Sequence, residues 1–334
     1  MDKSDKYHIV SQKLYERGLA EFKKGEYEEA LEDFSMAIEL NSDYALLYNS
    51  RGYVYQLIKD YENAINDYTL SIKFDPDNEV SYFNRGFAYY ILKKYRASIE
   101  DFTMAIQLKP KFVNAYNRRG QAYIQAKNHE EAILDFTKVI ELEPKNPDSF
   151  RNRGYVNYKL RRYDEAINDY TNVIEIKPDD AVSYSIRGRS YIHTKKYEEA
   201  INDFTKSLEL KPDDEISYNN RGYVHYLLKQ YEHSIEDYTC IIELVPDNSN
   251  AYCNRAKAFF ELSKFNEAIE DYSLAIDIDS DDSDLYNNRG LAYYEMNKFI
   301  EAIRDWEKAI ELNPRFENVL KIKIGYARDK LKQT

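Results

Sequence analysis

Histidine and cysteine often serve as metal ligands, nucleophiles and proton carriers, but they are few and scattered in this sequence. The histidines are His8, His129, His193, His225 and His233, and the cysteines are Cys240 and Cys253. No histidine–cysteine pair has the spacing of zinc ligands. A cysteine without a neighbouring histidine is usually unreactive. These residues therefore indicate neither a metal site nor a thiol nucleophile.

Other motifs that carry chemistry are also missing from the sequence. Asp279, Asp281, Asp282 and Asp284 lie close together, but they lack the alternating ligands and the closing glutamate of a calcium loop. The sequence contains no phosphate loop, dinucleotide fingerprint or nucleophile elbow. We therefore expect no catalytic residue, no cofactor and no bound metal, and we expect that the protein is not an enzyme.

Side chains suited to binding are more numerous, and the asparagines among them fall into two series whose members are spaced by multiples of 34 residues. An amide can donate to and accept from a polypeptide backbone at once. Asparagine also has low helix propensity, so its repeated use on one helix face favours a binding role over simple solvation. The candidate binding residues are Asn49, Asn84, Phe87, Asn117, Arg118, Gln121, Arg151, Asn152, Tyr155, Arg189, Asn219, Asn220, Tyr223, Asn254, Lys257, Asn287 and Asn288. Exposed aromatic side chains in this set are candidate anchors.

A second periodic set consists of arginines, each followed sixteen residues later by an aspartate. The arginines are Arg17, Arg51, Arg85, Arg119, Arg153, Arg187, Arg221, Arg255 and Arg289. The aspartates are Asp33, Asp67, Asp101, Asp135, Asp169, Asp203, Asp237, Asp271 and Asp305. A strip of nine arginines could bind phosphate groups, but nine matched aspartates would cancel its charge. We expect ion pairs or backbone hydrogen bonds that hold the helical hairpins in register.

The same period governs the glycines, most prolines and many aromatic residues, so the sequence is built from internal repeats. Eight of the ten glycines and seven of the eight prolines each occupy one repeat position. The nine repeats run 11–44, 45–78, 79–112, 113–146, 147–180, 181–214, 215–248, 249–282 and 283–316. Residues 1–10 form an N-terminal extension and residues 317–334 follow the last repeat.

The elements that position these side chains are two helices per repeat. With each repeat numbered 1 to 34, positions 4, 8 and 11 form one helical stripe and positions 20, 24 and 27 a second. Proline at position 32 ends the second helix. Glycine at position 8 is expected to face the small residue at position 20 where the helices cross. Because one helix pair cannot bury both of its faces, the pairs should stack into a solenoid.

The repeat pattern resembles that of the tetratricopeptide repeat family. The third repeat carries the signature as Tyr82, Gly86, Tyr89, Tyr95, Ser98, Phe102, Ala105 and Pro110. The resemblance implies an all-α fold, a right-handed solenoid of nine antiparallel helix pairs. A C-terminal capping helix is expected over 317–334, with Leu320, Ile324 and Ala327 inward and a charged exterior.

The resemblance also implies that the candidate binding residues line a concave groove that binds peptides. Inner-face asparagines are similar to those of the O-linked sugar transferases. The family's carboxylate clamp for chaperone tails needs Lys at position 5 and Asn at position 9 of one repeat, and no repeat here has both. Cations such as Arg118, Arg151, Arg189 and Lys257 would instead favour an acidic segment or the C-terminus of a partner.

The composition restricts the partners further. A net charge of −12 disfavours nucleic acid, and the sequence has neither a membrane-length apolar run nor a signal-peptide core. Two cysteines cannot build a disulfide framework, so a cytoplasmic location is expected. We expect a scaffold or adaptor that binds a protein or peptide and is a monomer or weak homo-oligomer. The alternatives are an accessory subunit of a glycosyltransferase- or chaperone-associated complex, a nucleic-acid-binding helical repeat, and self-association through the solenoid ends.

Overall fold

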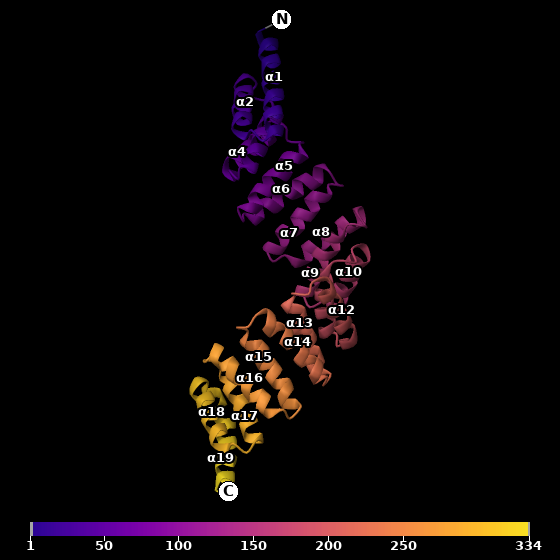
Figure 1. The fold of residues 1–334 in the computed structure, drawn as a ribbon. Coiled ribbons are helices and arrows are strands. Elements are labelled where there is room, and N and C mark those ends of the chain that lie inside the picture. The colour runs from indigo at the N-terminus through magenta and orange to yellow at the C-terminus, as the bar shows by residue number, and fades with distance from the viewer. Residues whose placement is uncertain (1–2, 333–334) are drawn as a thin grey trace. The chain divides into compact units, whose positions relative to one another are not determined.

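The computed structural model describes residues 3–332, and within that range every element is a helix (Figure 1). The protein divides into two compact units, residues 1–169 and 170–334. The boundary falls inside helix α10 (Tyr163–Ile176). The expected all-α fold of consecutive helix pairs is confirmed, and each unit is described by itself below.

The helices of unit 1 follow the predicted repeats. They are α1 (Lys3–Lys24), α2 (Tyr27–Leu40), α3 (Ala45–Leu57), α4 (Tyr61–Phe74), α5 (Glu79–Ile91), α6 (Tyr95–Leu108), α7 (Val113–Gln125), α8 (His129–Leu142) and α9 (Pro147–Lys159). Helix α1 starts eight residues before the first predicted repeat, so the described part of the N-terminal extension lengthens the first helix.

Unit 2 continues the same alternation after α10. Its helices are α11 (Ala181–His193), α12 (Tyr197–Leu210), α13 (Glu215–Leu227), α14 (Tyr231–Leu244), α15 (Ser249–Glu261), α16 (Phe265–Ile278), α17 (Ser283–Glu295) and α18 (Phe299–Leu312). A short 3₁₀ helix, η1 (Pro314–Phe316), and α19 (Glu317–Leu331) follow. The odd-numbered helices up to α17 are the first helices of their repeats.

A tight turn reverses the backbone between the two helices of each repeat. Its key residue, at position 15, has a left-handed backbone: φ is 66° at Lys59 and 85° at Gly25. The Asp60 amide donates to the Tyr55 carbonyl across this turn at 2.8 Å, the long bond of a Schellman motif. Because the turn is short, the second helix packs directly back on the first.

The position-8 glycines make room for an aromatic ring rather than for a small residue. A Cβ added at Gly120 would lie 2.8 Å from Cε1 of the Phe136 ring. Position 20 does approach this backbone, since the Ser98 hydroxyl donates to the Gly86 carbonyl at 2.7 Å. The expectation that glycine faces position 20 is therefore incomplete, because the ring at position 24 fills the space.

The predicted arginine–aspartate pairs all form, and each joins the two helices of one repeat. In the third repeat, Arg85 Nη2 and Nε lie 2.8 Å from Asp101 Oδ1 and Oδ2. The remaining Arg85 nitrogen, Nη1, donates to Thr69 Oγ1 of the preceding repeat at 3.1 Å. The guanidinium thus ties three helices together, α5 and α6 of its own repeat and α4 of the repeat before.

The same contact to the preceding repeat forms at each of the eight arginines from Arg51 to Arg289. The accepting hydroxyls lie at position 25 and belong to Ser35, Thr69, Thr103, Thr137, Thr171, Thr205, Thr239 and Ser273. These contacts support the expected role of the ladder in holding the helical hairpins in register, because each of them joins two consecutive repeats.

These ion pairs are largely removed from solvent, except at Arg17, whose side chain is 57% exposed. The side chains of Arg85 and Asp101 are 17% and 7% exposed. Burial raises the pKa of the Asp101 carboxyl, and the contact with Arg85 opposes that rise. Since desolvation offsets much of the attraction, the pair adds little net stability while it is intact. Removal of one partner leaves the other as a buried charge without a counter-charge.

The helix predicted after the last repeat is present as α19, and its inward stripe is confirmed. Leu320, Ile324 and Ala327 are all buried. Its exterior is not simply charged, as the sequence led us to expect. Val319, Ile322 and Tyr326 are 57%, 61% and 64% exposed, so α19 carries a second apolar strip.

We expect Arg85→Leu to lower the free energy of unfolding by about 3 kcal/mol, because Asp101 then remains buried without a counter-charge. The unpaired carboxyl has a raised pKa in the folded state, so the loss should be largest at pH 7 and smaller near pH 5, where protonation neutralises it. Urea unfolding at both pH values measures this. The double variant Arg85→Leu, Asp101→Leu should recover most of the loss, and an equal loss at both pH values would contradict the assignment.

Two glycine substitutions test the crossing geometry. Gly120→Ala should destabilise the protein by about 1–3 kcal/mol through overpacking against Phe136. Gly325→Ala, inside α19 with no atom within 4 Å of the added carbon, should stabilise it by about 1 kcal/mol through helix propensity. Thermal unfolding of both variants compares them, and equal effects of the same sign would refute the ring contact.

Candidate functional site

First helices of successive repeats adjoin within each unit, as α3, α5 and α7 do in unit 1 and α11 with α13 and α15 with α17 do in unit 2. Repeat positions 2, 5, 6, 9 and 12 of these helices share one side. We call this side of each unit the first-helix face. The candidate binding residues predicted from the sequence all occupy these positions.

The asparagines of this face in unit 1 bond to one another across repeats. Asn84 Nδ2 donates to Asn49 Oδ1 at 3.2 Å, and Asn152 Nδ2 donates to Asn117 Oδ1 at the same distance. Asn49 is only 8% exposed and donates in turn to Ser81 Oγ at 3.0 Å. Part of the predicted ladder therefore joins repeats, which leaves fewer amides to contact a partner.

The asparagines of unit 2 are arranged differently. Asn220 Nδ2 donates to the Ile216 carbonyl of its own helix at 2.7 Å, and Asn219 is exposed. Asn254 Oδ1 accepts from Lys257 Nζ at 3.3 Å. Asn287 Oδ1 is buried and has no hydrogen-bond partner among the described residues. Asn288 lines a cavity that is described below.

The cations of the face also differ in their surroundings. The Arg118 guanidinium lies 5.0 Å from the centre of the Phe87 ring, a cation–π contact, and donates to Gln121 Oε1 at 3.1 Å. Arg151 forms an ion pair with Asp148. Arg118 has no carboxylate partner in the part of the protein that the structure describes, so its charge is available to a ligand.

A cavity of about 350 Å³ opens on the first-helix face of unit 1. Its lining residues are Leu19, Phe22, Phe34, Leu46, Asn49, Ser50, Tyr53, Val80 and Asn84. Leu46, Tyr53 and Val80 are 38%, 40% and 41% exposed, and Phe22 lies against Tyr53 with ring centres 5.8 Å apart. This apolar site suits a bulky apolar side chain.

Sequence reasoning missed most of this cavity, although a signal was present. Position 2 carries an apolar residue in four repeats, and those residues are Leu46, Val80, Val182 and Ile216. Each of them is between 38% and 56% exposed. An apolar residue repeated on the side opposite the core stripe marks a surface kept for contact rather than for packing.

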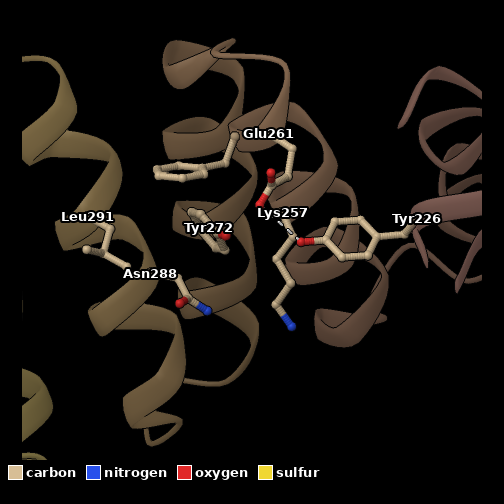
Figure 2. A pocket seen from close by; sticks show the side chains of 7 residues that line it. Tyr226, Lys257, Glu261, Tyr272, Asn288 and Leu291 are labelled. Atoms are coloured by element: carbon tan, nitrogen blue, oxygen red, sulfur yellow. Dashed lines mark hydrogen bonds between the residues drawn. The ribbon is translucent and has the colours of Figure 1, made fainter. Parts of the chain in front are cut away.

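Cavities also lie on the first-helix face of unit 2. One of about 190 Å³ includes Val182, Arg189 and Ile216 in its lining. Two others, of about 130 and 290 Å³, share Tyr226 and Lys257. Figure 2 shows the larger one, with Lys257 and Asn288 facing each other across it and the Tyr226 hydroxyl turned to Glu261.

The groups that could do other chemistry are not gathered into a site. No group of three or more His, Cys, Asp or Glu side chains within residues 3–332 could hold a metal ion. Cys253 is buried, and burial raises the pKa of its thiol. His225 stacks on His233 with ring centres 5.1 Å apart, and burial lowers the pKa of His225. Among the described helices, none is long and apolar enough to cross a membrane.

Comparison with family models identifies the repeats. A model described as TPR repeat matches residues 18–59, 57–93, 188–229 and 256–297. A second model, described as tetratricopeptide repeat, matches residues 80–112, 113–146, 147–180 and 283–316. Together these matches cover well over half of the sequence, and the chain belongs to the tetratricopeptide repeat family. No curated protein matches its sequence as a relative.

Solved structures share the fold. The C-terminal part of a TPR repeat-containing protein from Cytophaga hutchinsonii has a TM-score of 0.64 and 19% identity, over 72% of this chain and 98% of that one. A tetratricopeptide repeat protein from Parabacteroides merdae has a TM-score of 0.53 and 20% identity, over 75% and 99%. YrrB, a TPR protein with an unusual peptide-binding site, has a TM-score of 0.51 and 20% identity, over 55% and 95%.

Two asparagine variants separate structural amides from exposed ones. Asn49→Ala should destabilise the protein by about 1–2 kcal/mol, because it removes the hydrogen bonds that Asn49 makes to the Asn84 amide and to the buried Ser81 hydroxyl, which then keeps only Ser71 as a partner. Asn219→Ala, at an exposed position, should change stability by less than about 0.5 kcal/mol. Chemical denaturation of both variants provides the test, and equal losses would mean that Asn49 does not join repeats.

Proposed function

We propose that this protein is a non-catalytic scaffold that binds an extended segment of a partner protein on its first-helix faces. Members of the family are typically interaction scaffolds of this kind. The observation that carries the proposal is the set of cavities on the first-helix face of each unit, whose openings carry exposed apolar and aromatic side chains. Partner side chains would enter these cavities while the amides of the face contact the partner backbone.

The sizes of the cavities and the amide groups of the first-helix face support a peptide as the ligand. The cavities are separate and of side-chain size, between about 130 and 350 Å³, rather than one large chamber for a cofactor. The amides of Asn84 and Asn152 each keep an acceptor oxygen outside the bonds within the face. YrrB, which shares the fold, is described as having an unusual peptide-binding site.

Selection of phage-displayed random peptides on the full-length protein tests the proposal. Peptides that bind should be recovered. For some of these peptides, Leu46→Ser should lower the affinity by about tenfold, because it replaces an apolar side chain in the wall of the unit 1 cavity with a polar one. Fluorescence polarisation with the recovered peptides measures the change.

Leu134→Ser is the matched control, because Leu134 lies on α8, away from the first-helix face, and is 69% exposed. It should leave binding unchanged. Recovery of no peptide, or equal weakening by both variants, would overturn the proposal. The cytoplasmic location and the monomeric or weakly self-associating state expected from the sequence remain predictions.

A further inference from the structure

Two buried tyrosines of unit 2 carry hydroxyls that packing does not require. Tyr238 and Tyr272 occupy position 24 and are each 2% exposed. At this position Phe102 and Phe204 fill the same space without a hydroxyl. In unit 1 the corresponding Tyr68 hydroxyl donates to Gln56 Oε1 at 3.1 Å. Neither Tyr238 nor Tyr272 has a hydrogen-bond partner among the described residues.

Both tyrosines line cavities on the first-helix face. Tyr238 lines the cavity of about 130 Å³ with Tyr223 and Asn254. Tyr272 lines the cavity of about 290 Å³ with Asn288 and Leu291 (Figure 2). Burial raises the pKa of both phenols, so their hydroxyls remain donors at neutral pH. Neither hydroxyl oxygen is among the fully enclosed, unpartnered polar atoms of the described residues, so both are accessible from the cavities and can donate to a ligand that accepts hydrogen bonds.

Lys257 belongs to both cavities and separates them. Its ammonium contacts Asn254 Oδ1 at 3.3 Å and forms no ion pair with any described carboxylate. The nearby Glu261 is engaged elsewhere, since the hydroxyls of Tyr226 and Tyr231 donate to it at 3.3 and 3.4 Å. Glu261 also lines the larger cavity, but it forms no ion pair with Lys257. The ammonium, the two phenols and the Asn288 amide are therefore donors with no carboxylate bonded to them.

We propose that the first-helix face of repeats seven to nine binds an acidic side chain of an extended partner segment at Lys257, with the flanking side chains in the two cavities. This inference rests on the proposed function and specifies its ligand in unit 2. The carboxylate pairs with the Lys257 ammonium, and the phenols and the Asn288 amide donate to the carboxylate or to adjacent backbone carbonyls.

The two cavities favour an internal acidic residue over the C-terminus of a partner. A terminal carboxylate at Lys257 would leave one cavity without an occupant, whereas an internal residue places a neighbour in each. A dry cavity of about 150 Å³ is enough for benzene. The larger cavity therefore accepts a side chain of leucine or phenylalanine size, and the smaller one accepts a side chain of alanine or valine size.

The site differs from the carboxylate clamp of the family in the residues it uses. The clamp requires lysine at position 5, whereas Lys257 is at position 9, and position 5 of that repeat is Cys253. The phenols at position 24 come from the second helices, α14 and α16.

The test uses peptides selected on the full-length protein, synthesised with acetylated and amidated ends and measured by fluorescence polarisation. Those that bind unit 2 should contain Asp or Glu and should lose about tenfold in affinity with Lys257→Gln. Tyr238→Phe and Tyr272→Phe should each weaken them several-fold without loss of stability, because phenylalanine already occupies position 24 elsewhere. Replacing the peptide's Glu by Gln should abolish the effect of Lys257→Gln.

Matched controls are Lys330→Gln, an exposed lysine of α19, and Tyr68→Phe in unit 1, and both should leave these affinities unchanged. Peptides that bind but respond to none of the unit 2 variants would overturn the inference and leave the proposed function intact. Peptides that bind only with a free C-terminus would overturn it in favour of a terminal carboxylate. Recovery of no peptide would overturn both.

Discussion

A buried guanidinium at each junction between repeats is the contact on which the rest of the fold depends. Arg85 fixes α5 to α6 through Asp101 and to α4 through Thr69. Hydrophobic burial brings helices together without setting their register, whereas a planar guanidinium accepts partners only in fixed directions. One arginine per repeat therefore sets both the crossing of its helix pair and the placement of that pair on the one before.

Because these contacts use other repeat positions, the first-helix face of each unit is not needed for packing between helices. Arginine, aspartate, glycine and the position-24 ring hold the helices, so positions 2, 5, 6, 9 and 12 vary from repeat to repeat. In unit 1 they produce an apolar cavity around Tyr53 and a stacked cation at Arg118. In unit 2 they produce smaller cavities and an ammonium at Lys257. The same scaffold thus presents different chemistry along its length.

Periodicity predicted the helix pairs and the Arg85–Asp101 ion pair, because a fixed register implies fixed contacts between positions. It missed Thr69, which reaches the arginine only after the following repeat has stacked. It did not predict that Asn49 would bond to Asn84 and Ser81 of the next repeat. It placed position 24 on a helical stripe, where the Tyr272 ring is buried, but it did not predict that the Tyr272 hydroxyl would line a cavity. Such errors arise wherever neighbours from another repeat decide what a side chain touches.

The last junction departs from the arginine rule. Position 25 of the ninth repeat is Glu307 instead of a hydroxyl residue, and it accepts a hydrogen bond from Arg328 of α19 at 2.9 Å. The residue of α19 that corresponds to the position-7 arginine is Lys323, whose ammonium lies 5.8 Å from the centre of the Trp306 ring. Each repeat from the second to the eighth has both the arginine at position 7 and the hydroxyl at position 25, so each can form this contact with the repeat before it and the repeat after it. Duplication or deletion of such a repeat leaves every arginine–hydroxyl contact between repeats intact. The number of repeats can therefore change while the ninth repeat still packs against α19.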